Sequence, residues 1–290
     1  MSEVLLVTAG YESLLAAHGL RGLPAFFAWD QGQCLSKNRL ETWRERWRIV
    51  LGDGRQGERT FYLKRFDHPP FRRQLERWRG GHLRLSTAGI EWDNARQLAE
   101  RGIRASEPVA FGHDMLGGWE RRSFILLHEL AGESLERWVP VHVPPTHEET
   151  DWPRRRRCLD GLARFVAKFH AAGFVHRDLY LSHVFILPAT EDHGDEPDKA
   201  SVAYGLIDLQ RVFRPRWRQR RWVVKDLAAL NFSSPRDRIG RRDRLRFLCR
   251  YAQSCGRFGS ARQLARWVEG KTARMARRVA TGLATSTGDR

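Results

Sequence analysis

A His-Arg-Asp triplet, His176-Arg177-Asp178, stands between two apolar runs of the chain. An aspartate in such a loop can accept the proton of an attacking hydroxyl group, and a residue five positions further on can help to hold magnesium, as in phosphoryl transfer. Here these positions are Asp178 and His183. Histidine and arginine in this setting more often orient the loop than react, so we assign His176 and Arg177 to its support.

A second acidic residue, Asp208, ends the apolar segment 202–207, where a phosphotransferase of this kind keeps another magnesium ligand. The triplet reads Asp208-Leu209-Gln210 where protein kinases have Asp-Phe-Gly, so only the carboxylate is retained. Farther on, Asp226 opens an apolar helical pattern. We expect Asp226 to accept hydrogen bonds from the backbone of the catalytic loop.

These motifs resemble those of the bacterial lipopolysaccharide kinases, which phosphorylate heptose or Kdo sugars of the inner core. The resemblance rests on residues 176–183, on Ile207-Asp208-Leu209 and on residues 225–234, and it extends faintly from about residue 35 to about residue 280. It implies a protein-kinase-like fold, ATP and Mg²⁺ as cofactors, and a sugar hydroxyl as acceptor. Protein kinases have asparagine at the position of His183. The histidine found here instead resembles the lipopolysaccharide kinases.

Two alternating segments, residues 42–50 and 60–66, flank a glycine-rich turn and predict a β-hairpin. A lysine late in the second strand is expected to hold the α- and β-phosphates of ATP, because the strand fixes its stem. Lys64 and Arg65 compete for this role. The alternation favours Lys64, which shares a strand face with Tyr62 and Phe66.

The pattern of residues 86–99 predicts a helix whose glutamate could pair with Lys64. Glu91 is the candidate because it begins the amphipathic run, and Glu100 is the alternative. The basic stretch 72–84 before this helix is interpreted as a loop or a first helical turn that faces solvent or an anionic partner. No G-x-G-x-x-G motif precedes the strands, so we expect the loop over the nucleotide near residues 36–39.

Two further strands are predicted at residues 108–112 and 122–130. The second leads into a polar turn, where backbone groups of Glu129 and Leu130 could bond the adenine edge. We therefore expect an α+β, protein-kinase-like two-lobe fold with a small β-rich N-lobe and a mainly helical C-lobe. The expected parts are an N-terminal extension at 1–33, the N-lobe at 34–130 and the C-lobe at 131–290.

The C-lobe pattern begins with a surface excursion at 140–153 and a helix after residue 154 that carries the catalytic loop. A hairpin over 184–187 and 202–207 follows, and helices at 241–252 and 260–283 complete the lobe. A short basic and aromatic segment lies before Asp226 and lacks the A-P-E motif, which argues against a peptide substrate. We assign acceptor or membrane binding to five of its residues, Arg214, Arg216, Trp217, Arg218 and Arg220.

Composition indicates a folded protein that is attracted to polyanions. The chain has 51 Lys and Arg against 34 Asp and Glu, a net charge of +17, and 41% hydrophobic residues. Its four scattered cysteines are interpreted as free thiols of a reducing cytosol, and no signal peptide is recognised. We expect a cytoplasmic protein, peripheral at the inner face of the inner membrane, with no specific nucleic-acid partner.

The expected function is an ATP-dependent phosphotransferase acting on an alcohol group, a sugar hydroxyl of the lipopolysaccharide inner core. Two alternatives stay open. One is a small-metabolite or antibiotic kinase on the same fold, which would not require so basic a surface. The other is a catalytically inactive kinase-like binding module, prompted by the missing glycine loop and the altered Asp-Phe-Gly motif.

Overall fold

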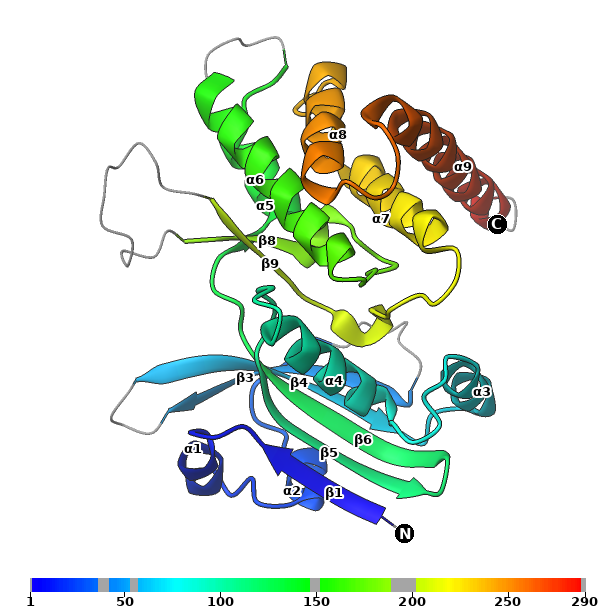
Figure 1. Cartoon of the computed structure of the whole chain (residues 1–290). Helices are drawn as coiled ribbons and strands as arrows, with labels where there is room; N and C mark the ends of the chain where they lie inside the picture. Colours follow the sequence, from blue (N-terminus) through cyan, green and yellow to red (C-terminus); the bar gives the residue numbers. More distant parts are fainter. Residues whose placement is uncertain (1, 36–41, 53–56, 147–151, 189–201, 288–290) are drawn as a thin grey trace. The chain divides into compact units, whose positions relative to one another are not determined.

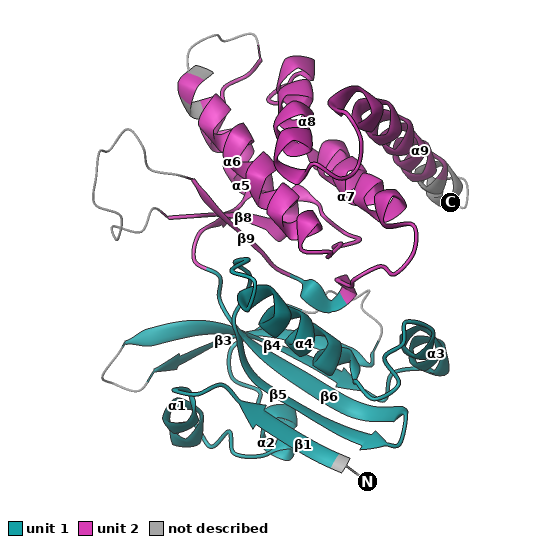
Figure 2. Ribbon diagram, viewed as in Figure 1, with its two compact units in different colours: residues 1–130, 208–210 teal, residues 131–207, 211–290 magenta. Residues whose placement is uncertain are grey.

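The computed structural model describes residues 2–35, 42–52, 57–146, 152–188 and 202–287 (Figure 1). The chain divides into two compact units (Figure 2): unit 1 is Met1–Leu130 with Asp208–Gln210, and unit 2 is Ala131–Ile207 with Arg211–Arg290. Unit 1 is built on an antiparallel sheet and unit 2 is mainly helical. The predicted α+β fold is therefore confirmed.

Unit 1 contains a sheet in the order β1-β5-β6-β4-β3-β2 in which every neighbouring pair is antiparallel. The predicted hairpin is present, with Arg46 opposite Lys64. The six strands are β1 (Ser2–Val7), β2 (Gln33–Cys34), β3 (Arg44–Gly52), β4 (Glu58–Asp67), β5 (Pro108–Leu116) and β6 (Trp119–His128).

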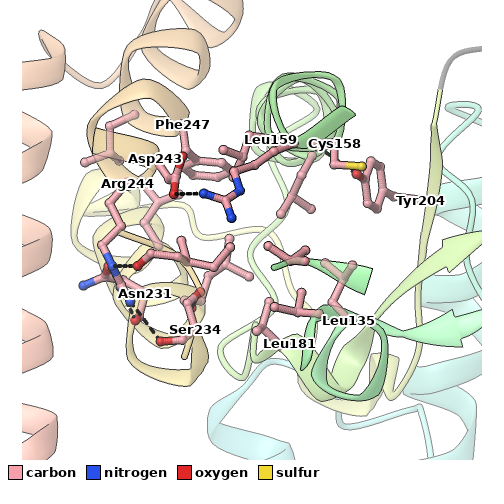
Figure 3. Close-up of a pocket in the computed structure, with 18 of the residues that line it drawn as sticks. Leu135, Cys158, Leu159, Leu181, Tyr204, Asn231, Ser234, Asp243, Arg244 and Phe247 are labelled. Carbon is pink, nitrogen blue, oxygen red and sulfur yellow. Dashed lines mark hydrogen bonds and ion pairs between the residues drawn. The ribbon is translucent and has the colours of Figure 1, made fainter. Parts of the chain in front are cut away.

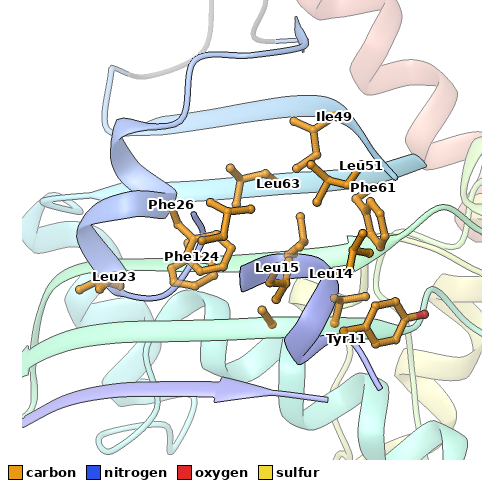
Figure 4. Packing of buried hydrophobic residues seen from close by; sticks show 14 residues of the cluster. Tyr11, Leu14, Leu15, Leu23, Phe26, Ile49, Leu51, Phe61, Leu63 and Phe124 are labelled. Carbon is orange, nitrogen blue, oxygen red and sulfur yellow. The ribbon is translucent and has the colours of Figure 1, made fainter. Parts of the chain in front are cut away.

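The two faces of this sheet are covered by different helices because side chains alternate along each strand. Helices α1 (Glu12–Ala17) and α2 (Leu23–Ala28) pack on the face that carries Phe61 and Leu63 (Figure 4). Helix α4 (Thr87–Ala99) packs on the opposite face, where Trp92 meets Phe66 and Phe111. The face under α4 is also the face of Lys64.

The first 33 residues, which we expected as an N-terminal extension, contribute to this sheet and its core. β1 pairs with β5 from Ser2 opposite Met115 to Val7 opposite Ala110, so it covers an otherwise unpaired edge. Tyr11, Leu14 and Leu15 lie in the same core cluster as Phe61. The sequence pattern missed β1 because a short edge strand carries little periodic signal.

The basic stretch after residue 70, which we expected as a loop or a first helical turn, begins with a complete helix. Helix α3 (Phe71–Arg79) begins after Pro70 and ends at Gly80, and it buries Gln74 and Arg77. Arginine-rich composition had suggested a solvated segment, but hydrogen bonds to backbone carbonyls let one arginine enter the interior.

Unit 2 combines helices with a small sheet in the order β7-β8-β9. The predicted hairpin of β8 and β9 is present. Residues 140–142 belong to a helix rather than to the predicted surface excursion, and residues 147–151 and 189–201 lie outside the described ones. The elements are β7 (Glu133–Ser134), α5 (Leu135–His142), α6 (Trp152–Ala171), η1 (Leu181–His183), β8 (Val184–Leu187), β9 (Ala203–Leu206), α7 (Gln219–Ser233), α8 (Arg241–Cys255) and α9 (Ala261–Thr287); a short turn, η2 (Leu209–Arg211), begins in unit 1 and ends in unit 2.

The interior of unit 2 holds an apolar cavity of about 90 Å³ (Figure 3). Leu159 and Leu162 of α6 line it together with Phe247 of α8, because the apolar stripe of α6 faces that helix. An ion pair of 3.8 Å between Arg155 and Asp243 lies among the lining side chains. Among the described residues, no helix is both long and apolar enough to span a membrane.

Candidate functional site

Three predicted site residues meet in unit 1, on the face of the sheet that α4 covers. The Nζ atom of Lys64 lies 2.7 Å from Oε1 of Glu91 and 3.1 Å from Oδ1 of Asp208. Lys64 is 5% exposed and Glu91 is fully buried, whereas Asp208 is half-buried. The ammonium group is thus held between one buried carboxylate and one that solvent can reach.

Helix α4 brings Glu91 to this position. Its first turn is fixed by Ser86, whose hydroxyl accepts a hydrogen bond of 3.1 Å from the backbone N–H of Gly89. Asn94, one turn after Glu91, donates a 3.0 Å hydrogen bond to the carbonyl of Leu209 and so holds the residue after Asp208. The alternative glutamate, Glu100, is exposed at the helix end and lies 3.7 Å from Arg101.

Arg65, the competitor of Lys64, points to the other face of the sheet. Its guanidinium lies 3.1 Å from Oε2 of Glu45, donates to the carbonyl of Trp29 and stacks over Trp47. Arg65 is therefore a packing residue of the α2 side. The geometry favours Lys64 as the cation of this site, and its role toward ATP stays a prediction.

Arg44 is a cation of this site that the sequence interpretation did not single out. Burial lowers the pKa of Arg44, while the negative charges of Asp208 and Glu91 act in the opposite direction. Its guanidinium lies over the ring of Phe66, on the same sheet face as Lys64. The alternation of Arg44, Arg46 and Arg48 along β3 was the available signal, but a row of three arginines does not show which one enters a site.

Asp208 fits a magnesium–nucleotide site as a single carboxylate ligand. It adopts a left-handed backbone conformation with φ of 59°, which is uncommon for a residue other than glycine. Within the described ranges, no group of three or more His, Cys, Asp or Glu residues could hold a metal ion alone. Magnesium commonly takes one or two protein carboxylates and completes its shell with phosphate oxygens and water.

The predicted adenine contacts lie at the end of β6. The backbone N–H of Glu129 donates a 2.9 Å hydrogen bond to the carbonyl of Thr60, so this donor is already engaged. The Glu129 carboxylate accepts a 2.9 Å hydrogen bond from the hydroxyl of Tyr62. A contact from Glu129 to adenine would therefore use its carbonyl group, and Leu130 follows as the last residue of this part of unit 1.

The catalytic-loop residues lie in unit 2, where Asp226 organises their backbone. The fully buried carboxylate of Asp226 accepts hydrogen bonds from the N–H groups of His176, at 2.6 Å, and Arg177, at 2.8 Å. Arg177 takes a left-handed conformation with φ of 71°. The His176 ring lies 3.0 Å from the carbonyl of Ile207, the residue before Asp208. The loop is thus tied both to α7 and to the end of β9.

Asp178 presents its side chain next to an arginine that the sequence interpretation missed. Oδ2 of Asp178 lies 2.6 Å from Nη1 of Arg211. The ring of His183 bonds the backbone carbonyl of Asp178 through Nδ1 at 2.8 Å, and because a carbonyl only accepts, Nδ1 is the donor. The lone pair of a neutral His183 is then on Nε2, which is the atom that could approach a metal ion or a bound water.

The five residues of the predicted acceptor or membrane patch occupy different surroundings in unit 2. Trp217 is 83% exposed and Arg216 is exposed beside it. Arg214 stacks over the buried ring of Phe174, at 5.4 Å. Arg218 and Arg220 instead line a groove of about 830 Å³ between α7 and α9.

The α7–α9 groove is strongly basic and holds two indole rings. Arg220 lies 4.6 Å from the ring centre of Trp267, and Arg177 lies 5.5 Å from that of Trp222. Among the residues that the structure describes, its lining has no acid and consists of Arg177, Arg218, Arg220, Arg221, Trp222, Val224, Lys225, Trp267, Lys271 and Arg274.

Two lysines of the groove show the effect of this crowding. Burial lowers the pKa of Lys271, and the charges of Arg274, Arg278 and Arg221 lower it further. Burial likewise lowers the pKa of Lys225, although the charge of Asp178 raises it. A bound anion would relieve this mutual repulsion.

Comparison with known proteins identifies the family. A family model described as the Lipopolysaccharide kinase (Kdo/WaaP) family matches residues 28–251, which is more than half of the chain. The chain belongs to this family. The match includes Lys64, Glu91, Asp178 and Asp208.

Similar proteins include the lipopolysaccharide core heptose(I) kinase WaaP of Pseudomonas aeruginosa, 38% identical over 164 residues, and a 3-deoxy-D-manno-octulosonic acid kinase of Xylella fastidiosa, 25% identical over 143 residues. The aligned part covers 56% of this chain and 58% of the Pseudomonas kinase. A solved structure described as WaaP in complex with acyl carrier protein is 27% identical, with a TM-score of 0.66, and the match covers 96% of this chain and 98% of that one. The protein-kinase-like fold is thereby confirmed.

Proposed function

We propose that this protein transfers the γ-phosphoryl group of ATP to a sugar hydroxyl, on heptose or Kdo, of the lipopolysaccharide inner core. The observation that carries the proposal is the Lys64–Glu91–Asp208 arrangement of unit 1. A buried ion pair is costly to maintain unless it has a purpose or excellent geometry, and this one leaves Oε2 of Glu91 without a hydrogen-bond partner in the described structure. A buried polar atom that is left unsatisfied calls for a functional explanation, such as a bound ion or ligand.

In this proposal Lys64 holds the α- and β-phosphates and Glu91 fixes its ammonium group. Asp208, with its carboxylate open to solvent, would hold Mg²⁺, which neutralises charge on the phosphates when it is bound. Arg44 adds a second positive charge on the same sheet face. Units 1 and 2 would correspond to the N-lobe and the C-lobe, with the adenine edge at Glu129 and Leu130.

Asp178 is proposed as the base that orients and deprotonates the acceptor hydroxyl. Its Oδ2 is engaged by Arg211, which leaves Oδ1 for the hydroxyl proton. His176, Arg177 and Asp226 maintain the loop through backbone hydrogen bonds. His183 orients Asp178 by donating a hydrogen bond to its backbone carbonyl, and Nε2 of His183 would reach Mg²⁺ through a bound water.

The α7–α9 groove is proposed to bind anionic groups of the acceptor. It begins at Arg177, the neighbour of Asp178, and its volume is that of a ligand larger than a single phosphate. Guanidinium groups held over indole rings are pre-organised to bind phosphate or carboxylate through two hydrogen bonds. A core oligosaccharide carries such groups beside its hydroxyls.

The test is transfer of label from γ-labelled ATP, with Mg²⁺, to a panel of truncated lipopolysaccharide cores that differ in their last sugar. We expect label in at least one core that offers an unphosphorylated heptose or Kdo hydroxyl, and none in the same core after that hydroxyl is blocked. Label that enters only a small metabolite would replace this proposal with the small-metabolite kinase. ATP binding without transfer to any acceptor would favour the inactive binding module.

A further inference from the structure

Helix α3 buries two polar side chains and exposes an aromatic one, which is the opposite of what a surface helix in water usually does. Its polar residues Gln74 and Arg77 are buried, whereas Phe71 is 61% exposed and Trp78 is half-buried. Phe71 and Trp78 are seven residues apart, so they lie on one face of the helix. A surface helix ordinarily turns its aromatic face inward.

Hydrogen bonds fix this orientation. Nη1 of Arg77 donates to the carbonyls of His82, at 2.8 Å, Leu83, at 3.2 Å, and Leu85, at 2.7 Å. Gln74 donates a 2.7 Å bond to the carbonyl of Glu120. These hydrogen bonds hold α3 in the orientation that leaves the side chain of Phe71 in solvent.

Phe71 belongs to a contiguous group of exposed apolar side chains. Ring centres are 6.3 Å apart for Phe71 and Trp78, 6.3 Å for Phe71 and Trp119, and 6.1 Å for Trp78 and Trp119. Leu116 and Trp119, at the turn between β5 and β6, are 60% and 38% exposed. Leu83 is 53% exposed and packs on Gly118, next to Trp119. We call Phe71, Trp78, Leu83, Leu116 and Trp119 the aromatic surface. Contiguous apolar patches of this kind mark interaction sites.

Basic side chains accompany the aromatic surface. The segment from residue 71 to residue 84 contains five arginines and one glutamate. Arg79 and Arg84 are exposed, and neither forms an ion pair within the described part of the chain. Helices that lie in the interface of an anionic bilayer commonly combine tryptophan and phenylalanine with neighbouring arginine residues.

We propose that the aromatic surface inserts into the headgroup region of an anionic lipid bilayer and anchors unit 1 there. Phe71, Trp119 and Leu116 would enter the interface while Arg79 and Arg84 approach lipid phosphates. This surface is separate from the residues 214–220 that the sequence suggested for membrane binding. The inference does not require transfer activity, because bilayer binding is measured without ATP or acceptor.

The test is flotation of the full chain with vesicles of phosphatidylcholine containing phosphatidylglycerol. We expect the wild type to float and the double variant Phe71→Ser/Leu116→Ser to lose about tenfold or more in vesicle affinity, since two apolar side chains no longer leave water. Arg79→Gln/Arg84→Gln should weaken binding to these vesicles and leave the weaker binding to pure phosphatidylcholine unchanged.

A matched control removes exposed apolar side chains elsewhere: Val141→Ser/Leu245→Ser, at positions 75% and 42% exposed in unit 2, should float like the wild type. Thermal melting of all variants checks the fold. Unchanged flotation of Phe71→Ser/Leu116→Ser would overturn the proposal. So would a wild-type dimer that this variant converts to monomers with vesicle binding intact, because the aromatic surface would then join two copies of the chain.

Discussion

Lys64 and Arg65 are neighbours on β4, yet they meet opposite surroundings. Lys64 contacts two carboxylates under α4, and Arg65 contacts Glu45 and Trp29 on the α2 side. Strand alternation alone was sufficient to separate them, because one step along a strand reverses the face. Arg211 beside Asp178 could not be anticipated in this way, since nothing periodic in the segment after Asp208 shows which arginine turns back to the loop.

This pair gives a prediction with an internal control. Lys64→Met should lower kcat/KM for ATP by about 100-fold or more, because the phosphates lose a positioned cation. Arg65→Met should leave kcat/KM within a few-fold but lower the free energy of unfolding by roughly 1–3 kcal/mol, through loss of buried hydrogen bonds. Steady-state kinetics and thermal melting measure both. Loss of ATP turnover in Arg65→Met with normal stability would assign the phosphates to Arg65.

At the scale of elements, the sequence predicted the hairpin of β3 and β4, helix α4, the strands β5 and β6, and the hairpin of β8 and β9. In these segments the spacing of apolar residues is strongly periodic, because one face or both faces of each strand or helix are buried. β1 and α5 were missed for physical reasons, and α3 was expected only as a loop or a first helical turn. An edge strand of six residues has little pattern, α3 hides an arginine that composition assigns to solvent, and α5 contains Pro140.

The groove between α7 and α9 exists only when two elements far apart in sequence come together, so its α9 residues were not predicted. Lys271→Gln/Arg274→Gln should raise KM for a phosphorylated, deacylated core oligosaccharide by roughly tenfold, because two charge-assisted contacts are lost. KM for ATP should stay unchanged. Acceptor and ATP titrations in the transfer assay measure the two constants.

The control is Arg262→Gln/Arg266→Gln, which removes two exposed charges from the same helix outside the groove and should leave both constants as in the wild type. An equal rise in KM for the acceptor in this control would show that the net charge of α9 acts, rather than the groove. An equal rise in KM for ATP in Lys271→Gln/Arg274→Gln would place the groove with the nucleotide.

In the whole molecule, unit 1 carries the residues that we propose to bind phosphate, and unit 2 carries the loop that we propose to supply the base. The H-R-D triplet indicated Asp178, and the acidic end of the 202–207 segment indicated Asp208. Both are local motifs that the sequence shows directly. Their partners, Glu91 on α4 and Asp226 on α7, are 27 and 50 residues distant from Lys64 and His176. Helix periodicity placed these two residues on the correct faces. Membrane and acceptor surfaces carry no comparable local signal.

We propose that Asp178 takes the proton of the acceptor hydroxyl, and this role governs the transfer step. The direct measurement is single-turnover transfer from γ-labelled ATP to a core acceptor by the wild type and by Asp178→Asn, with Asp237→Asn, an exposed acid of unit 2, as control. We predict a rate about 10²- to 10⁴-fold lower for Asp178→Asn, with unchanged melting temperature and ATP affinity, and an unchanged rate for Asp237→Asn. A wild-type rate in a stable Asp178→Asn variant would rule out Asp178 as the base.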